Sequence, residues 1–379
     1  MKRKLAALAL VLLLWGGAAG CGPRQAPGRG EEEAAPASAA SAAQEEETPP
    51  AEGEPSPAEQ VPRGEAPGEE SAPEEERQAD PAAVQEPQAA PGFVKVQVGT
   101  VDLAYGAFAL DGEGRLYFCP IQEEGAPFLV AEGVEDFCYT PREFFLLDRE
   151  GRLLSTDDLG YWQGCTFEEV VQVPQGEEGV AAANTTVLLA GGDLLTCQSG
   201  TGSWNRLEAN AQTVAAGYWG MAILDREGQL WFLDRSTQEL ELVADGVIDC
   251  AYSDWSKTSY HNDLWYVTSD QILHREDRLG TEDRGEDYWY PRRARAVDAS
   301  NGYYLAQLED GSYLWGYGSQ EGAVPVPVTG GEGSLLWLYY AILDGEGALH
   351  VGRVPPLQGD IYHAGMEPLA DRIIPHPAA

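Results

Sequence analysis

Positive charge is scarce in this chain of 379 residues. Its 24 Lys and Arg stand against 62 Asp and Glu, which leaves a net charge of −38. Nucleic acids and anionic membranes would repel such a surface, so neither kind of general binder fits. Methionine is scarce too, with 3 residues against 44 Gly, 10 Trp and 17 Tyr. This composition favours turn-rich β structure with an aromatic core over a helix bundle.

Familiar catalytic motifs are also missing. The sequence contains no Gly-x-Ser-x-Gly, no His-Glu-x-x-His, no P-loop and no Cys-x-x-Cys. Its five His are not paired at metal-ligand spacing. The acidic turns described below could offer oxygen ligands to Ca²⁺, but each has only two carboxylates and these already have a role in the turn. We therefore predict a protein that is not an enzyme and that holds neither a metal nor a cofactor.

The first 20 residues indicate a signal peptide rather than part of a fold. Lys2, Arg3 and Lys4 precede an apolar run at 5–15, which is too short to span a bilayer. Small residues then lead to Cys21, and this order resembles the lipobox of bacterial lipoproteins, with Ala18 where Leu is commoner. The resemblance implies lipidation of Cys21 with fatty acids such as palmitate. The protein would then be anchored in the cell membrane, facing outside the cytoplasm. The alternative is an ordinary cleaved signal with a chance cysteine.

Residues 21–92 contain the lipidated Cys21 followed by a Pro-, Glu- and Ala-rich linker. The stretch 22–92 has 13 Pro, 17 Asp and Glu, 4 Arg and no aromatic residue. Such a segment cannot bury enough apolar surface to offset its ordering entropy, so we expect a disordered linker. Its net charge is −13 and that of the basic leader is +3, which leaves −28 on residues 93–379.

A short phrase recurs through residues 93–379. Copies of the form Leu-Asp-Gly/Arg-Glu-Gly-x-Leu begin at Leu110, Leu147, Leu224 and Leu343, with weaker copies from Ala190, Thr268 and Gln307. The position two before the last apolar residue falls at 114, 151, 192, 228, 270, 311 and 347. Seven units of about 39 residues, rich in β-formers, predict an all-β, seven-bladed β-propeller of four-stranded antiparallel blades. In each turn we expect Asp to accept backbone N–H groups and Gly to supply a positive φ.

The order of elements within each unit resembles the regulator of chromosome condensation (RCC1-like) repeat. The best matches are Val214–Phe232 and Val297–Gly316, and the resemblance covers about 99–353. The family's usual His at the start of the second strand is replaced by Gly106, Gly220 and Tyr303. The resemblance implies a propeller but no particular activity, because the family includes exchange factors, enzyme inhibitors and scaffolds.

The end of the chain indicates how the ring closes. Residues Pro368–Ile373 resemble Leu242–Val247, which form an outer strand and a connector. We expect the C-terminal segment to supply the outer strand that blade one lacks, with Val94–Leu103 supplying the rest. A closed ring hides the edges of its sheets.

Five cysteines remain besides Cys21, and they show no disulfide framework, although disulfides are possible outside the cell. Cys119 and Cys197 occupy equivalent repeat positions and are expected to be small core residues.

Alternate loops of such a blade exit on opposite faces. The acidic hairpins and the connectors share one face, the hairpin face, and are uniform. The loops between the first and second and between the third and fourth strands share the other, the variable face, and blade five is enlarged there within 253–263 and 274–291. This face is expected to carry Tyr105, Arg142, Tyr218, Trp219, Trp255, Tyr260, His261, Asn301, Tyr303, Trp337 and Tyr339.

Exposed aromatic residues beside Arg are typical of interface hot spots. The partner-binding candidates are Tyr218, Trp219, Trp255, Tyr260, His261, Trp289 and Arg292. The alternative is that several of the variable-face rings, Tyr303 and Trp337 above all, only pack between blades. We expect a surface-anchored lipoprotein whose propeller binds a protein or peptide and no nucleic acid. A glycan-binding propeller, an enzyme (lyase or hydrolase) working in the central channel, and a plain structural spacer are the other readings.

Overall fold

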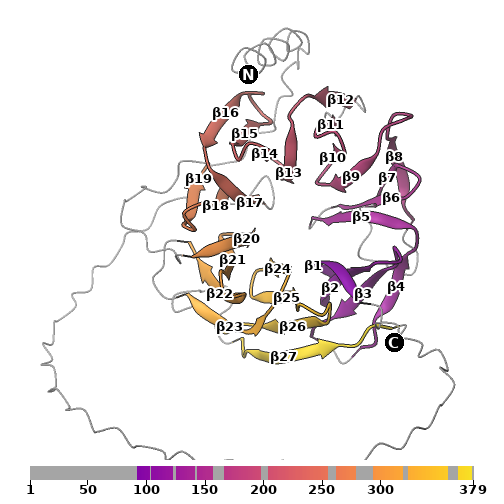
Figure 1. Ribbon diagram of the computed structural model, residues 1–379. Coiled ribbons are helices and arrows are strands. Elements are labelled where there is room, and N and C mark those ends of the chain that lie inside the picture. Colours follow the sequence, from indigo (N-terminus) through magenta and orange to yellow (C-terminus); the bar gives the residue numbers. More distant parts are fainter. Residues whose placement is uncertain are drawn as a thin grey trace, which may run out of the picture. The chain divides into compact units, whose positions relative to one another are not determined.

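Short strands joined by tight turns make up the computed structural model of this protein. It describes residues 92–377 except 103, 123–124, 141–142, 157–165, 198–203, 255–261, 279–292, 319–322 and 357–365. The predicted signal peptide, Cys21 and the predicted linker lie outside the described residues. Within them, 27 strands form seven antiparallel sheets arranged in a ring (Figure 1). The predicted seven-bladed β-propeller is confirmed.

The first strand of each blade lines the centre of the ring, and the strand order then runs outward. Blades one to three contain β1 (Phe93–Val101), β2 (Ala104–Asp111), β3 (Leu116–Pro120), β4 (Phe128–Ala131), β5 (Val134–Tyr139), β6 (Phe144–Asp148), β7 (Arg152–Thr156), β8 (Glu168–Gln172), β9 (Gly179–Ala182), β10 (Thr186–Leu189), β11 (Leu194–Cys197) and β12 (Trp204–Leu207).

The remaining blades continue the same order around the ring. Blades four and five contain β13 (Ala211–Ala216), β14 (Gly220–Asp225), β15 (Leu230–Asp234), β16 (Leu240–Ala244), β17 (Val247–Asp254), β18 (Asn262–Thr268) and β19 (Leu273–Asp277). Blades six and seven contain β20 (Ala294–Ser300), β21 (Tyr303–Leu308), β22 (Ser312–Tyr317), β23 (Val324–Thr329), β24 (Gly333–Leu336), β25 (Tyr339–Leu343), β26 (Leu349–Arg353) and β27 (Leu369–Ile374).

Six blades have the predicted four strands. Blade five shows three, β17 to β19, in the described part of the chain, and residues 279–292 that follow lie outside it.

The hydrophobic core lies between neighbouring blades. The second strands, such as β14 and β25, are buried along their whole length because a neighbouring blade covers each face of the sheet. One apolar cluster joins blades three and four through Leu194, Met221 and Ile223. A larger one joins blades seven, one and two. Each sheet therefore depends on its two neighbours for most of its apolar burial.

Four of the seven hairpin turns have the predicted mechanism, whereas the equivalent position is Leu189, Thr268 or Leu308 in the other three. The Asp225 carboxylate accepts hydrogen bonds from the N–H groups of Glu227 at 3.0 Å and Gln229 at 2.8 Å. Asp111, Asp148 and Asp344 make the same pairs of bonds in their own turns. The turn glycines have positive φ, from 76° at Gly151 to 90° at Gly192.

The carbonyl of this positive-φ residue reaches the next blade. The Gly228 oxygen accepts the N–H of Val247, the first residue of β17, at 2.9 Å. The same bond runs from Val134 to Gly114, from Ala211 to Gly192, from Ala294 to Gln271 and from Gly330 to Gly311. A Cβ on Gly228 would lie 3.2 Å from the Val247 carbonyl oxygen, so close approach as well as positive φ requires glycine here.

The predicted turn position of blade five is wrong by one residue. Gln271, with φ 65°, occupies the position of the turn glycines, because its N–H bonds the Thr268 carbonyl and its own carbonyl accepts from Ala294. Asp270 precedes it. The repeat pattern of the sequence placed the turn at 270 because it counted back from Ile272, whereas Leu273 is the residue that begins β19.

The predicted route of ring closure is also wrong. β27 is the outer strand of blade seven and pairs with β26, whereas blade one builds all four of its strands from Phe93 to Ala131. The propeller starts with an inner strand, β1, and ends with an outer one, β27. The place where the ring closes, which we call the seam, therefore lies between two complete blades. The repeating bond nonetheless closes the ring, since Phe93 N–H donates to the Gly347 carbonyl at 3.2 Å.

Contacts from the C-terminal strand strengthen this seam. Ile374 is buried in the cluster shared by blades seven and one. The Arg372 guanidinium donates to the Pro120 carbonyl at 2.6 Å, and the His376 ring lies 4.8 Å from that of Phe93. The C-terminus therefore holds the seam by packing across it rather than by lending a strand to blade one.

Deletion of residues 364–379 tests the role of this strand. Without β27, the edge of β26 would be bare and Ile374 would no longer fill the seam, so we expect a loss of several kcal/mol or aggregation. Thermal unfolding measured by circular dichroism would show it. An unchanged Tm would contradict the account of the seam given above.

Candidate functional site: the variable face and the central channel

The hairpins and the other loops lie on opposite faces of the ring, as predicted. The strand order places the turns between β2 and β3, β6 and β7, and β14 and β15 on the hairpin face, together with the connectors between blades. The loops that follow each first and third strand lie on the variable face. Those loops differ in length and in residue type from blade to blade, as the sequence predicts.

Only two of the predicted partner-binding residues fall among the described residues. Tyr218 and Trp219 form the turn between β13 and β14 on blade four. Tyr218 is 36% exposed, and its ring meets the Trp219 ring edge-on at 5.0 Å. The turn is pinned by the bond from Gly217 N–H to the Gly220 carbonyl at 2.9 Å. Trp255, Tyr260, His261, Trp289 and Arg292 lie outside the described residues, as does Arg142.

Other variable-face rings divide between surface and core. Tyr303 is 3% exposed and stacks on Trp315 at 5.3 Å, so for this residue the packing alternative is confirmed. Tyr339 is 2% exposed and stacks on Tyr105 across the seam of blades seven and one, with ring centroids 4.1 Å apart. Tyr105, Trp337 and Asn301 are half-buried.

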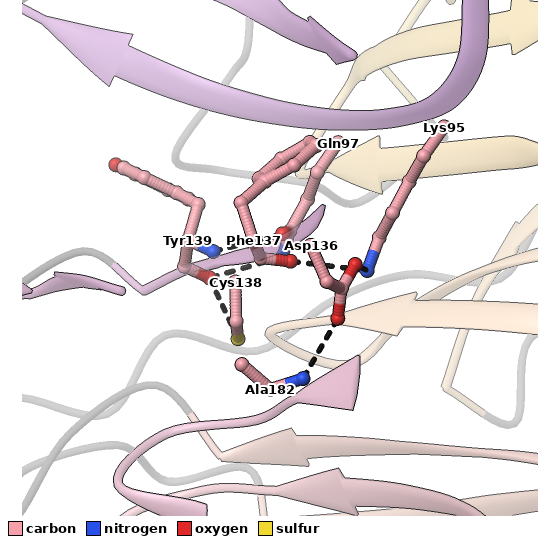
Figure 2. A network of polar contacts seen from close by, with 7 residues as sticks. All are labelled: Lys95, Gln97, Asp136, Phe137, Cys138, Tyr139 and Ala182. Carbon is pink, nitrogen blue, oxygen red and sulfur yellow. Dashed lines mark hydrogen bonds and ion pairs between the residues drawn. The ribbon is translucent and has the colours of Figure 1, made fainter. Parts of the chain in front are cut away.

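The first strands enclose a central channel of about 420 Å³. A polar network links three of its strands, as Figure 2 shows. The Lys95 ammonium on β1 donates to Asp136 Oδ1 on β5 at 2.5 Å and to the Phe137 carbonyl at 3.0 Å. Asp136 Oδ2 accepts from Ala182 N–H on β9 at 2.7 Å. Side chains in the channel thus tie each of these strands to the next.

Two more carboxylates act in the same way at other junctions around the channel. Asp249 on β17 accepts from Val297 N–H on β20 at 2.8 Å. Asp298 on β20 accepts from Leu335 N–H on β24 at 2.7 Å. Each of these acids bridges its own blade to the following one, so Asp249 and Asp298 help to hold the ring together.

The channel has two unlike walls. Blades six, seven, one and two present charged and polar residues to it, including Asp298, Glu332 and Lys95. Blades three and four present small residues, among them Ala183, Thr213 and Ala215. The described lining therefore carries more negative than positive charge, from Asp249, Asp298 and Glu332 against Lys95, and blades three and four contribute none of it.

Burial shifts the acidity of these groups. It raises the pKa of Asp249 and of Asp298 to about 6. Burial alone would lower the pKa of Lys95, but the negative charges of Asp136 and Glu332 outweigh it and the pKa lies above its ordinary value. Lys95 is therefore a fixed positive charge, whereas the two aspartates titrate near neutral pH.

Sequence reasoning missed the channel network. A weak signal for it existed, because Asp249 and Asp298 each interrupt a strand that is otherwise mostly apolar. Nothing in the sequence showed that these carboxylates would bond the backbone of the next blade, since each pair of partners is separated by about 40 residues.

Among the residues described, no group of three or more His, Cys, Asp and Glu is arranged to hold a metal ion. Cys119 is fully buried, as expected, and it is free, as are Cys138 and Cys250. The side chain of Cys197 lies outside the described residues. No helix within the described ranges is long and apolar enough to cross a bilayer.

Comparison with known proteins adds little on function. No protein-family model matches the chain, and no curated protein matches its sequence. Prp20p of Saccharomyces cerevisiae is similar in structure at 12% identity and a TM-score of 0.47, covering 76% of this chain and 88% of that one. YCF48 bound to D1 peptide is similar at 13% identity and a TM-score of 0.47, covering 72% and 96%. The Cps50 propeller of Myceliophteria thermophila is similar at 12% and 0.47, covering 70% and 100%.

The channel aspartates predict an unusual dependence of stability on pH. Their folded pKa lies above the ordinary value of about 4, so protonation favours the folded ring and stability rises as the pH falls from 8 through 6. At the hairpins burial alone would raise the pKa of Asp111 and Asp344, but backbone N–H groups lower it, so their contribution is lost only below about pH 4.

We expect a higher Tm at pH 5.5 than at pH 8, measured by calorimetry. Asp249→Asn and Asp298→Asn keep the hydrogen-bond acceptor without the charge. Each should raise stability at pH 8 by about 1 kcal/mol, allowing for solvent in the channel, and should shrink the difference between the two pH values. Asp310→Asn, on an exposed hairpin, is the control and should leave that difference unchanged. A Tm that rises steadily from pH 5.5 to pH 8 would refute this prediction.

Proposed function

We propose that this protein is a lipoprotein of the cell surface whose propeller binds a protein or peptide partner through its variable face. Its blades would be of the RCC1-like repeat type. The observation that carries the proposal is the Tyr218–Trp219 pair, two large rings held side by side at the tip of a pinned turn. Aromatic side chains of this kind supply contact area at low entropic cost when they are desolvated at an interface.

The hairpin face has fewer features that a partner could recognise than the variable face has. Four of its turns repeat one sequence, and their Asp side chains are occupied by their own backbone N–H groups. A surface that repeats around the ring gives little basis for distinguishing one partner from another. The variable loops differ in every blade, so specificity would reside there.

Binding, rather than catalysis, also agrees with the channel. Three of its described carboxylates, Asp136, Asp249 and Asp298, accept hydrogen bonds from the next blade, and Lys95 pairs with Asp136. A catalytic acid or base must be free to exchange a proton with substrate. These four groups are engaged in joining blades instead.

Binding by the variable face is tested with the full-length protein in its own cells. Cross-linking followed by pull-down identifies a partner, and Tyr218→Ala and Trp219→Ala should each weaken its binding about tenfold without changing the Tm. Glu113→Ala and Glu227→Ala, on the hairpin face, are the matched controls and should bind normally. If the hairpin variants lose binding while the loop variants keep it, the face is wrongly assigned.

The anchor is tested separately through Cys21. We expect the protein to incorporate labelled palmitate and to sediment with membranes, because several acyl chains anchor stably. Cys21→Ala should lose the label and move to the soluble fraction, whereas Cys119→Ala should behave as the original protein does. Membrane association that survives Cys21→Ala would overturn lipid anchoring.

A further inference from the structure

The turn between β24 and β25 contains a residue type that differs from those at the equivalent position in other blades. Three other turns between a first and a second strand place Asp102, Asn184 or Asn301 in the left-handed region, with φ of 49°, 34° and 50°. Asp and Asn adopt this conformation most readily among residues with a side chain. At the same place blade seven has Trp337, with φ of 58°.

The turn does not need the indole. The Trp337 backbone carbonyl accepts a hydrogen bond from Trp315 Nε1 on blade six at 3.2 Å. Any residue held in the same conformation would present that carbonyl. A bulky residue in a strained conformation is found mainly where it serves a function, so the side chain itself needs an explanation.

Three aromatic residues near the seam, Trp337, Tyr339 and Tyr105, belong to or pack against one apolar cluster, and we call them the aromatic strip. The Trp337 indole is half-buried against the apolar clusters of blades six and seven and of blades seven and one. Tyr339 and Tyr105 are stacked on each other. Arg353 and Gln122 both donate to the Tyr339 hydroxyl, and Arg353 does so at 3.1 Å. The strip is thus rigid before any partner arrives.

A carboxylate lies on the adjacent turn. Asp102 is exposed on the variable face at the end of β1, the strand whose Val98 N–H bonds Ser334 on β24 at 3.0 Å. Among the described residues, no ion pair or side-chain hydrogen bond involves the Asp102 carboxylate. Its neighbour Val101 belongs to the same cluster against which Trp337 packs.

Aromatic rings beside a carboxylate suit one ligand chemistry. A Lys or Arg side chain is attracted to the face of an aromatic ring and pairs with the acid. The protein already holds one of its own cations in this way, because Lys95 Nζ lies 5.2 Å from the Phe137 ring centroid while it pairs with Asp136. The net charge of −28 on residues 93–379 also favours a basic partner.

We propose that Trp337, Tyr105 and Asp102 form a receptor for one Lys or Arg side chain of the partner, at the seam of blades seven and one. This proposal rests on the proposed function, in that it names the chemistry that the variable face recognises. The residues that make it belong to blades other than the one that carries Tyr218.

The probe is the peptide acetyl-Gly-Gly-Arg-Gly-Gly-amide, with Lys, Gln and Glu versions and N-acetylglucosamine beside it. The full chain, kept soluble by Cys21→Ala, is labelled with ¹⁵N, and the Trp337 indole N–H and the Asp102 amide are followed by NMR. We expect saturable shifts with the Arg and Lys peptides, weakened by salt, and none with Gln or Glu. Equal shifts with the Gln peptide, or shifts with the sugar alone, would overturn the proposal.

Variants separate recognition from packing. Trp337→Asn restores the residue type of the other turns, so relief of backbone strain should offset part of the lost packing against the two clusters and the Tm should fall by a few degrees at most, while the Asp102 amide no longer responds to the Arg peptide. Asp102→Asn should weaken binding of the Arg peptide at least threefold, and Glu113→Gln, which removes one charge from the hairpin face, should not. If Trp337→Asn lowers the Tm by many degrees and Asp102→Asn binds normally, Trp337 serves packing alone and the proposal fails.

Tyr218→Ala distinguishes this inference from the proposed function. It should leave binding of the Arg peptide unchanged, since Tyr218 lies on blade four. If the natural partner depends on Tyr218 but the Arg peptide does not bind, the proposed function stands and the receptor is wrong. If the peptide binds but loss of Tyr218 and Trp219 leaves the partner unaffected, the receptor stands and the proposed role of the blade-four turn falls.

Discussion

One backbone hydrogen bond recurs around the ring, and the rest of the structure depends on it. At five junctions the turn residue with positive φ points its carbonyl at the first N–H of the next inner strand, as Gly228 does toward Val247. At the other two, Gly151 and Gly311 reach Val173 and Gly330 in the connector instead. The bond needs a residue that tolerates positive φ and leaves room for the neighbouring strand. Between Gly347 and Phe93 it closes the ring without a shared strand.

This constraint accounts for the unlike faces. The hairpin face carries a residue with positive φ in every blade and the turn-forming Asp in four of them, because the Asp carboxylate shapes the turn and the positive-φ residue reaches toward the next blade. The loops of the variable face are not restricted to particular residues in this way. Blade four can therefore place Tyr218 and Trp219 there, and blade seven can place Trp337 in a turn where other blades use Asn or Asp.

A second set of contacts links the blades around the channel. There, carboxylate side chains accept the backbone N–H groups of the next blade, whereas at the hairpins the carbonyl of the turn residue accepts them. Asp136, Asp249 and Asp298 reach from one blade to the backbone of the next. Ionised carboxylates make strong acceptors, but burying them in a narrow channel raises their pKa. Strength at each junction is thus set against the cost of burying a charged carboxylate, which is why the ring should prefer mildly acidic solution.

The sequence by itself determined the seven blades and the chemistry of the hairpins, because the repeat of Asp and Gly is local and each turn is built within about seven residues. It also placed Tyr218 and Trp219 in a loop of the variable face. Only the tertiary structure decided that β27 completes blade seven, that Gln271 replaces glycine in blade five, that Tyr303 is buried, and that Lys95 and the channel aspartates link successive blades. The physical reason is the same in each case: these outcomes depend on contacts between neighbouring strands and blades, and no local pattern shows which partner a strand or a carboxylate will meet.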